Sequence, residues 1–273
     1  MKDKTVAIIG LGAIGNSTAK KMSKKGFNLI LIDRDIIEEK NLSYQKLYSK
    51  KDIGESKAFV AAKKLGGKAF AEDLTFENIK ILNKANIILD CTDNMETRFL
   101  INDYCVKKRK PWIYSAGIKH TGTTINFLPG KACFRCVFNN TKGEETCETA
   151  GISLNIINKI SNLQVKNALK ILSDDLVEEK MIRIISSNKL QKIIITKQQK
   201  CKACNKKYEY LEGTNHSKAT KLCGSNMYQI KGEKQKSFEK INEKISIFPD
   251  GRVLIKANSQ TEARSLYSKY IGN

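Results

Sequence analysis

Three glycines and one aspartate near the N-terminus have the types and spacing of a nucleotide site. Gly10, Gly12 and Gly15 form the pattern G-x-G-x-x-G directly after a short apolar run, and Asp33 ends the next apolar run. Glycines let the backbone approach a phosphate, and the start of a following helix offers free N–H groups and a partial positive charge. A carboxylate at the end of the second strand can accept hydrogen bonds from ribose hydroxyls. These residues predict a nucleotide site for either NAD or ATP.

Two pairs of cysteines have the spacing of a metal site. Cys133 and Cys136 form one C-x-x-C pair, and Cys201 and Cys204 form another. Each pair can place two thiolates on one tetrahedral ion, so the four together predict a closed structural zinc site without an open position for a reacting water. A redox C-x-x-C pair is the alternative. We expect zinc to hold the C-terminal segment against the main domain.

The elements that position these residues follow from hydrophobic periodicity. Strand, glycine turn, helix and strand in this order define a βαβ unit, which needs a parallel sheet and a right-handed crossover. We predict an α/β fold: a Rossmann-like, mostly parallel sheet with flanking helices, zinc-binding knuckles of four cysteines and a small α+β C-terminal appendage. The predicted strands are 5–9, 28–33, 85–91, 112–115, 123–127, 181–185, 192–196, 244–248 and 252–256. One predicted helix runs from after Gly15 to about Lys25, and the others cover 55–65, 95–108, 152–172 and about 260–270.

The C-terminal part of the chain has its own organisation. A polar stretch over 210–225 predicts a loop, and the alternating strands beyond it meet at the turn Pro249-Asp250-Gly251. Ser259-x-x-Glu262 is a capping pattern for the last helix. We therefore expect two domains, 1–222 with the four-cysteine zinc site and 223–273 as the small appendage.

Composition and charge limit the class of protein. The chain has 273 residues, of which 41% are hydrophobic, as is ordinary for a soluble globular protein. No apolar run approaches the ~20 residues of a membrane span, and the N-terminus lacks the pattern of a secretion signal, so we expect a cytoplasmic protein. The net charge of +21 comes from 49 basic and 28 acidic residues, with Lys predominant. We interpret it as a solvated surface that attracts an acidic protein partner, without direct nucleic-acid binding or membrane contact.

Further motifs distinguish between the two nucleotides. The acidic turn Asp33-Arg34-Asp35 is followed by Asn41-Leu42 and Gln45. Asp52-Ile53-Gly54 then precedes Lys57-Ala58, and Asp93-Asn94 follows a strand. Over residues 4–222 this ordered set resembles the ThiF/MoeB/HesA family, the prokaryotic relatives of ubiquitin-activating enzymes. The resemblance favours ATP, and an NAD-dependent oxidoreductase is the less favoured alternative.

The resemblance implies an adenylyltransferase that uses ATP and magnesium. Its partner would be a small ubiquitin-like sulfur-carrier protein ending in Gly-Gly, whose C-terminal glycine is adenylated for sulfur transfer or conjugation. The enzyme itself is expected to be a homodimer. The carrier's carboxylate must attack the α-phosphate, so two anions have to be brought together, and cations must neutralise the charge that develops.

The family's site residues have counterparts in this chain. By resemblance, Asp33 would hold the ribose, Asn41 and Lys57 would contact phosphates, and Asp93 would bind magnesium. An N-cap on the following helix is a second role open to Asp93. The residues expected to line the nucleotide site are Gly10, Gly12, Ala13, Gly15, Asp33, Asn41, Gln45, Lys57, Asp93 and Asn94.

The chain departs from the family pattern at two points. The family motif N-L-x-R-Q has an arginine on the phosphates, whereas this chain has Tyr44, which can donate a hydrogen bond but carries no charge. Arg34 and Lys46 are candidates to compensate. The family also commonly has an N-terminal segment with another arginine, and we expect this segment to be absent. These departures motivate a second hypothesis, a family member that binds nucleotide or carrier without turnover.

Cys147 is a candidate catalytic nucleophile. It lies in the polar stretch GEETCETAGI just before a predicted long helix, and a nearby helix N-terminus lowers the pKa of a thiol. In the family, a cysteine at this position precedes a T-A-G segment, and some members use it for a covalent sulfur linkage with the carrier. A bystander thiol is the alternative. Cys91 and Cys105 lie in apolar settings and are predicted to be core residues.

Overall fold

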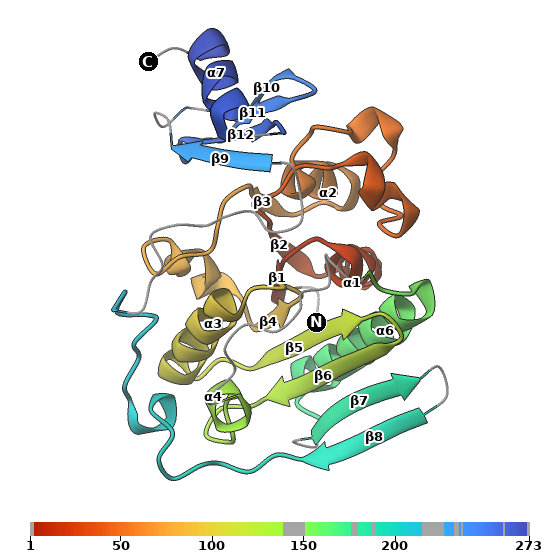
Figure 1. The fold of residues 1–273 in the computed structure, drawn as a ribbon. Coiled ribbons are helices and arrows are strands. Elements are labelled where there is room, and N and C mark those ends of the chain that lie inside the picture. Colours follow the sequence, from red (N-terminus) through yellow and green to blue (C-terminus); the bar gives the residue numbers. More distant parts are fainter. Residues whose placement is uncertain are drawn as a thin grey trace.

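The main sheet has eight strands and combines parallel with antiparallel pairing. Its strands are β1 (Thr5–Ile9), β2 (Asn28–Ile32), β3 (Lys68–Phe70), β4 (Ile87–Asp90), β5 (Trp112–Ile118), β6 (Thr121–Phe127), β7 (Lys180–Ser186) and β8 (Lys189–Ile194). Their order is β3-β2-β1-β4-β5-β6-β7-β8, parallel from β3 to β5 and antiparallel from β5 to β8 (Figure 1). The computed structural model describes residues 3–138, 151–175, 180–186, 189–214, 227–231, 235, 237–258 and 260–271. The parallel half is the predicted Rossmann-like arrangement, and its strand order changes direction between β1 and β4.

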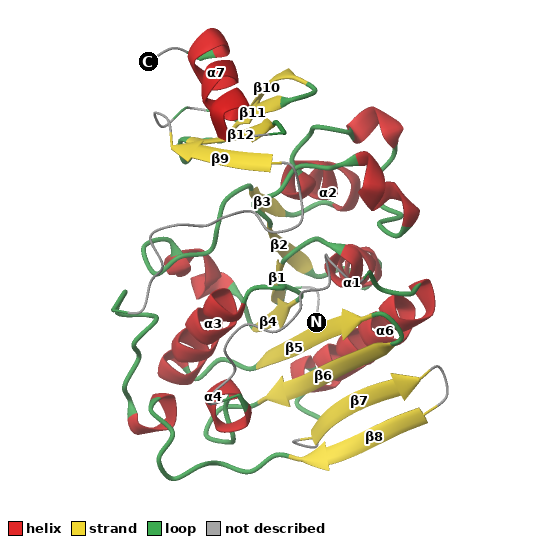
Figure 2. Ribbon diagram, in the orientation of Figure 1, coloured by secondary structure: helices red, strands yellow, loops and turns green. Residues whose placement is uncertain are grey.

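Helices cover both faces of this sheet (Figure 2). One face packs against α1 (Ala13–Ser23), α2 (Lys57–Leu65) and α6 (Leu154–Leu172). The opposite face packs against η3 (Ile79–Lys84), α3 (Met95–Lys108) and α4 (Phe134–Val137). The short 3₁₀ helices η1 (Glu39–Ser43), η2 (Lys50–Asp52) and η4 (Ala203–Asn205) lie in the connections. The helix predicted over 95–108 has the same bounds in the structure.

Alternating side chains of β1 divide the hydrophobic core into two layers. Val6 and Ile8 belong to the layer of α1, α2 and α6, and Ala7 and Ile9 belong to the layer of α3 and α4. All four side chains are at most 3% exposed. A central parallel strand is buried on both faces, so its sequence is continuously apolar. The short run at 5–9 is therefore a strand in the middle of the sheet.

Two differences from the predicted elements concern strands with a weak pattern. β8 begins at Lys189 and not at 192, so most of the stretch predicted as a hairpin loop is strand paired with β7. β8 is an edge strand, and Lys189, Leu190 and Gln191 are exposed, so they lack the alternation of a half-buried strand. β3 is absent from the predicted elements because three residues are too few to carry a periodic signal.

A second, smaller sheet lies beyond α2 and β3 (Figure 1). It consists of β9 (Met227–Lys231), β10 (Glu239–Asn242), β11 (Ile245–Ile247) and β12 (Arg252–Lys256), all antiparallel, in the order β10-β11-β12-β9. The helix α7 (Gln260–Tyr270) packs on one face through Ala263. Met227, Phe248 and Leu254 join the core of the main sheet instead. We call β9 to α7 the appendage; the predicted boundary at 222 falls among residues outside the described part and stays a prediction.

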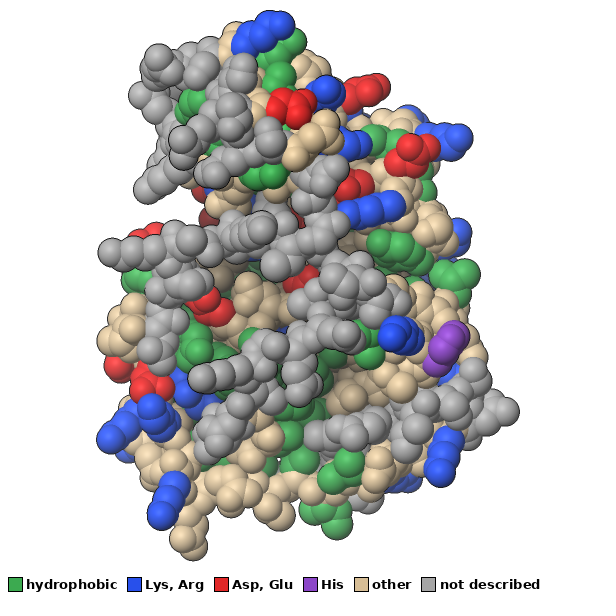
Figure 3. All heavy atoms as spheres, in the orientation of Figure 1, with side chains coloured by type: hydrophobic (Ala, Val, Ile, Leu, Met, Phe, Trp, Pro, Cys, Tyr) green, Lys and Arg blue, Asp and Glu red, His purple; other side chains and the backbone are tan. Residues whose placement is uncertain are grey.

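Charged side chains of both signs are spread over the surface. On the face drawn in Figure 3, the Lys and Arg side chains of the described residues are scattered, with Asp and Glu side chains among them. This distribution agrees with a solvated, Lys-rich surface as the source of the net charge of +21. Among the described helices, none has the length and apolar character that crossing a membrane requires.

In the glycine turn between β1 and α1, alanine substitutions at Gly12 and Gly15 should differ strongly in their effect on the free energy of unfolding. A Cβ at Gly15 would lie 1.8 Å from the backbone oxygen of Gly10, whereas a Cβ at Gly12 would meet no atom within 4 Å. We expect Gly15→Ala to lower the free energy of unfolding by about 3 kcal/mol or more, since the clash is with rigid backbone. Gly12→Ala, the matched control, should stay within about 0.5 kcal/mol of the parent chain. Urea unfolding of both variants measures the difference, and equal stabilities would contradict the packing described for this turn.

Candidate active site

A cavity of about 900 Å³ opens at the carboxyl ends of β1, β2 and β4. In open α/β sheets, ligands bind at this edge, where the strand order reverses. The predicted nucleotide-site residues that line it are Gly10, Gly12, Ala13, Asp33, Asn41, Gln45, Lys57, Asp93 and Asn94. Gly15 is not among the lining residues, because it packs behind the turn against the backbone of Gly10. Cys147 lies outside the described residues, so its predicted role stays a prediction.

The glycine turn forms an open cradle at the start of α1. Gly10 has φ = +82°, a conformation that strongly favours glycine, and its N–H donates to the backbone oxygen of Ile32 at 2.9 Å. Gly12 is the N-cap of α1 and offers no side-chain oxygen to the N–H groups of the first turn. The cradle therefore has the helix dipole and the free space that an anionic phosphate needs.

Asp33 fixes the acidic turn at the end of β2. One carboxylate oxygen accepts the N–H of Leu11 in the glycine turn, and the other accepts the N–H of Asp35 at 2.7 Å. The side chain is almost fully buried. Burial raises the pKa of Asp33 to about 6, although the nearby charge of Lys57 acts in the opposite direction. Asp33 thus connects the two predicted halves of the nucleotide site.

Lys57 forms a salt bridge with the second acid of this turn. Its Nζ lies 3.0 Å from Oδ2 of Asp35, and its backbone N–H donates to the backbone oxygen of Asp35 at 3.0 Å. Burial by itself would lower the pKa of Lys57, but Asp35 and Asp33 outweigh it and hold the pKa above its ordinary value. For the acid Asp35, burial by itself would raise the pKa, but the charges of Lys57 and Arg34 outweigh burial and hold the pKa below its usual value. The lysine is charged and lies inside the cavity.

The two candidates to replace the family arginine differ in position. Arg34 lines the cavity, with its guanidinium 3.1 Å from Asp73 and 3.6 Å from Asp35. Lys46 is exposed, is not among the lining residues and contacts the backbone oxygen of Leu42. A further cation, Lys40, lines the cavity from η1, and the sequence did not single it out.

Tyr44 contacts Asn41, a residue that is predicted to bind a phosphate. Asn41 donates from Nδ2 to the Tyr44 hydroxyl at 3.3 Å and accepts the N–H of Glu38 on Oδ1. Gln45 is 2% exposed, and its Oε1 has no hydrogen-bond partner among the described residues. A buried polar atom usually has a partner, so this oxygen fits a site that a polar ligand completes.

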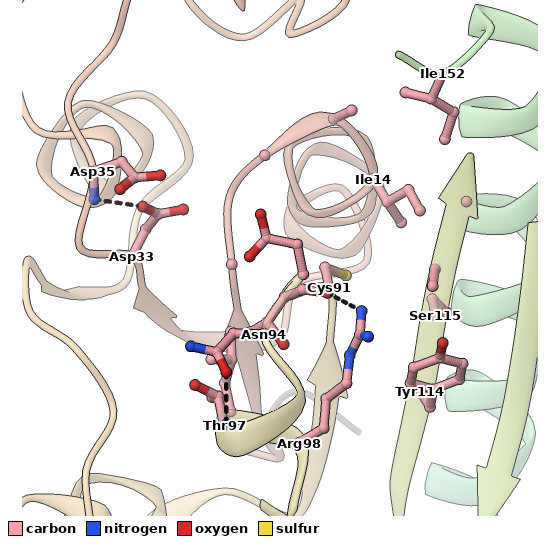
Figure 4. A pocket seen from close by; sticks show the side chains of 18 of the residues that line it. Ile14, Asp33, Asp35, Cys91, Asn94, Thr97, Arg98, Tyr114, Ser115 and Ile152 are labelled. Atoms are coloured by element: carbon pink, nitrogen blue, oxygen red, sulfur yellow. Dashed lines mark hydrogen bonds between the residues drawn. The ribbon is translucent and has the colours of Figure 1, made fainter. Parts of the chain in front are cut away.

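The opposite wall combines a buried arginine with an aromatic ring. Arg98 lies with its guanidinium 4.9 Å from the ring centre of Tyr114 and its Nε 3.6 Å from Oδ2 of the fully buried Asp90. Figure 4 shows Asp33 and Asp35 on one side of the cavity and Arg98 and Tyr114 on the other. Arg98 lines the cavity and Asp90 lies beside it, and neither was predicted from the sequence as a site residue. Their signal was a strand ending in an acid, and an arginine one helical turn after an N-cap.

Asp93 is free for a role other than capping. The N-cap of α3 is Asn94, whose side-chain oxygen accepts the N–H groups of Glu96 and Thr97 at 2.8 and 3.4 Å. Asp93 is exposed and lines the cavity. The capping role considered for Asp93 therefore belongs to its neighbour Asn94, and magnesium binding by Asp93 stays a prediction.

The four paired cysteines converge on one point. Sγ of Cys133 lies 3.8 Å from Cys136, 3.4 Å from Cys201 and 3.6 Å from Cys204, and all four sulfur atoms lie within 4.8 Å of one another. Zinc with Zn–S bonds of ~2.3 Å at tetrahedral angles requires sulfur separations of about 3.8 Å. The donor set and the spacing therefore fit a closed zinc site of four thiolates.

A buried arginine holds the same segments together. Arg135, between the first two cysteines, lies 3.1 Å from Asp103 of α3 and 3.3 Å from Glu209. Its guanidinium also lies 5.1 Å from the ring centres of Phe99 and Tyr210. The cysteine cluster and Arg135 together fasten the segment after β8 to α3.

The fold and the cavity define a nucleotide-binding α/β enzyme domain with an attached cluster of four cysteines. In comparison with known proteins, the description "ThiF family" matches residues 1–210. The chain is 31% identical to the sulfur carrier protein ThiS adenylyltransferase of Bacillus subtilis, with 100% of this chain and 94% of the relative covered. It is 33% identical to the enzyme of that name in Escherichia coli, with 63% of this chain and 73% of the relative covered.

Solved structures share the fold. Escherichia coli MccB, in a crystal structure with ATP, has a TM-score of 0.62 and 23% identity, covering 74% of this chain and 66% of that chain. MccB with AMPCPP and MccA has a TM-score of 0.66 at 22% identity, covering 74% of this chain and 67% of that chain. The chain belongs to the ThiF family, and its class is that of the adenylyltransferases.

Titration of Asp33 is expected to make nucleoside binding depend on pH. With a pKa of about 6, Asp33 is mostly protonated at about pH 5 and ionised at about pH 7.5. Only the ionised form can accept hydrogen bonds on both oxygens, so adenosine should bind about tenfold more weakly at pH 5, one unit below the pKa. Calorimetric titration with adenosine, which has no phosphate to titrate, measures this ratio.

The Asp33→Asn variant is the control for this pH dependence. It should bind adenosine weakly and with no step near pH 6. The folded state binds the Asp33 proton more tightly than the unfolded state, so the contribution of Asp33 to the free energy of unfolding falls as the pH rises from about 4 to about 6. Equal adenosine affinity of the parent chain at the two pH values would contradict the proposed contact.

Proposed function

We propose that this protein uses ATP and Mg²⁺ to adenylate the C-terminal glycine of a small ubiquitin-like sulfur-carrier protein that ends in Gly-Gly. The carrier's carboxylate attacks the α-phosphate, an acyl-adenylate forms, and pyrophosphate leaves. The observation that carries this proposal is one cavity that holds the glycine cradle, the Asp33 turn, Lys57 and Asp93 together. The names of its relatives support the choice of substrate.

The two ends of the cavity suit the two substrates. Asp33 and Asp35 mark the end for the ribose, and the start of α1 marks the place for the phosphates. Towards the other end, the lining from β5 and β6 combines the larger Tyr114 and Ile118 with several smaller residues. The smaller residues are Ser115, Ala116, Gly117, Thr121, Gly122 and Thr123. We place the carrier tail at this end because Asp33 and the glycine turn account for the nucleotide at the other.

Two charged residues of the cavity, Asp93 and Lys57, have parts in the proposed reaction. Asp93 would hold the magnesium, which neutralises charge on the phosphates when bound. Lys57 would bring a second positive charge to the attacked phosphate, where charge develops in the transition state. Its salt bridge with Asp35 holds the side chain inside the cavity before the nucleotide binds.

ATP–pyrophosphate exchange tests the proposed reaction. With ATP, Mg²⁺ and a carrier ending in Gly-Gly, the protein should exchange labelled pyrophosphate into ATP. Lys57→Met should lower kcat by about 100-fold, in the range found when one transition-state donor is removed. Lys63→Met is the matched control, because Lys63 is exposed on the same helix, and it should leave the rate unchanged. Absence of exchange with every Gly-Gly carrier tested would overturn the proposal.

The position of Tyr44 favours one alternative, a protein that binds nucleotide or carrier without turnover. Tyr44 brings no charge to the cavity and holds the Nδ2 group of Asn41. Nucleotide binding without exchange, persisting in a Tyr44→Arg variant, would support this alternative over adenylation. Exchange in the parent chain would exclude it.

We also propose that the cysteine cluster binds one structural zinc ion. A closed set of four thiolates leaves no position for substrate, so the ion would stabilise the fold and take no part in the reaction. The distances between the four sulfur atoms support zinc over a redox pair.

Elemental analysis and thermal unfolding test the zinc site. The purified chain should contain about one zinc ion, and Cys201→Ser should lose it and melt at a lower temperature. Cys147→Ser, which changes a cysteine outside the cluster, should keep the zinc content of the parent chain. A parent chain without zinc, with a disulfide between paired cysteines, would favour the redox alternative.

Three expectations from the sequence stay predictions. They are the covalent role of Cys147, the homodimer and the cytoplasmic location. The Gly-Gly protein that co-purifies with this chain would identify the carrier.

A further inference from the structure

The appendage contacts the acidic turn through one buried arginine. Arg252, at the start of β12, donates from Nη1 to the backbone oxygen of Arg34 at 3.2 Å and from Nη2 to that of Ala71 at 2.7 Å. It is 7% exposed. Arg34 follows β2 and Ala71 follows β3, and these two strands are paired in the sheet. The guanidinium therefore joins their carboxyl ends, next to the Asp33 turn that lines the cavity.

Arg252 is itself held in a single orientation. Its Nε donates to Oδ2 of Asp250 at 2.7 Å, and its guanidinium lies 4.5 Å from the ring centre of Phe248. Asp250 also accepts the backbone N–H of Arg252 at 3.1 Å. Nε is thus used within the β11–β12 turn, and the two terminal nitrogens are directed at the main domain. The planar fork of arginine suits this role, because its donors have a fixed geometry.

A second set of contacts reaches the segment that leads to Lys57. Lys240 donates from Nζ to the backbone oxygen of Ile53, and Ser246 donates from its hydroxyl to that of Gly54 at 3.1 Å. Gly54 has φ = +83° and packs against the Lys240 side chain. The appendage therefore holds the backbone three residues before Lys57 as well as the backbone next to Asp35.

These two anchors lie on either side of the salt bridge in the cavity. The segments after β2 and before α2 already contact each other through the bridge between Ile36 and Ser56. Arg252 holds the first segment, and Ser246 and Lys240 hold the second. None of these three residues lines the cavity, and their hydrogen bonds to the two segments end on backbone oxygens.

We propose that the appendage contributes to nucleotide binding and that Arg252 is a positioning residue. Arg252 holds the backbone so that Asp33 can contact the ribose and Lys57 can contact the phosphates. This inference rests on the nucleotide site of the proposed function. It deepens that proposal by assigning part of the ATP affinity to a segment outside the nucleotide-binding sheet. The Bacillus subtilis relative aligns over 100% of this chain and so includes the appendage.

Two substitutions separate the donors of Arg252 from its packing. Arg252→Met keeps an apolar stem against Phe248 and loses all donors, whereas Arg252→Lys keeps one charged donor and loses the fork. We expect the dissociation constant for ATP with Mg²⁺ to rise about tenfold in Arg252→Met and about threefold in Arg252→Lys. In pyrophosphate exchange, the KM for ATP should rise by similar factors while the KM for the carrier stays constant. Lys256→Ala, at an exposed position of the same strand, is the matched control.

Calorimetric titration of the full chain separates positioning from loss of folding. Misfolding lowers the number of binding sites per chain, whereas a displaced acidic turn raises the dissociation constant of the sites that remain. If Arg252→Met does not fold, Arg252→Lys and Lys240→Met carry the test, because each changes one anchor only. ATP affinities of Arg252→Lys and Lys240→Met equal to that of the parent chain would overturn the inference and leave the proposed function intact. No ATP binding by the parent chain would overturn both.

Discussion

The salt bridge between Lys57 and Asp35 is the interaction on which the geometry of the cavity depends. Two charged groups inside a protein are tolerated only when they compensate each other, and the neighbouring Asp33 adds a third charge to the same place. The pair fixes the distance between the end of β2 and the start of α2. In the proposed site, Asp33 at the end of β2 would hold the ribose and Lys57 at the start of α2 would approach the phosphates. Burial raises the pKa of Asp33 against the charge of Lys57, whereas Asp35 and Asp33 raise the pKa of Lys57 against the effect of burial.

Several parts of the chain hold this arrangement from outside the cavity. Arg252 and Ser246 of the appendage donate hydrogen bonds to the backbone of the two segments that the salt bridge joins, the one after β2 and the one before α2. On the far side of the sheet, the cysteine cluster and Arg135 fasten the segment after β8 to α3, whose first turn carries Arg98 into the cavity. The site therefore lies between two structural attachments that are distant from each other in sequence.

The pattern of positive charge in the cavity differs from the arginine-rich arrangement that the family resemblance implies. Arg34 and Lys57 both pair with Asp35, and Arg98 lies beside Asp90, so much of the basic charge is offset by acids of the same site. Tyr44 contributes a hydroxyl to Asn41 in place of a charge. Such a site keeps its cations in place before a ligand arrives, and magnesium bound by Asp93 would bring the additional charge that phosphates require.

Elements with strong patterns and residues in local motifs could be predicted from the sequence alone. The continuous apolar run of β1, the glycine turn, Asp33 and the two C-x-x-C pairs could be recognised because each signal lies within a few neighbouring residues. Which distant residues meet depends on how the chain folds in three dimensions. The pairing of Lys57 with Asp35, the stacking of Arg98 on Tyr114 and the reach of Arg252 to Arg34 join segments by side-chain contacts that leave no periodic trace. Short or exposed strands such as β3 and β8 were missed or misplaced for a related reason, since periodicity reports burial and these strands have little of it.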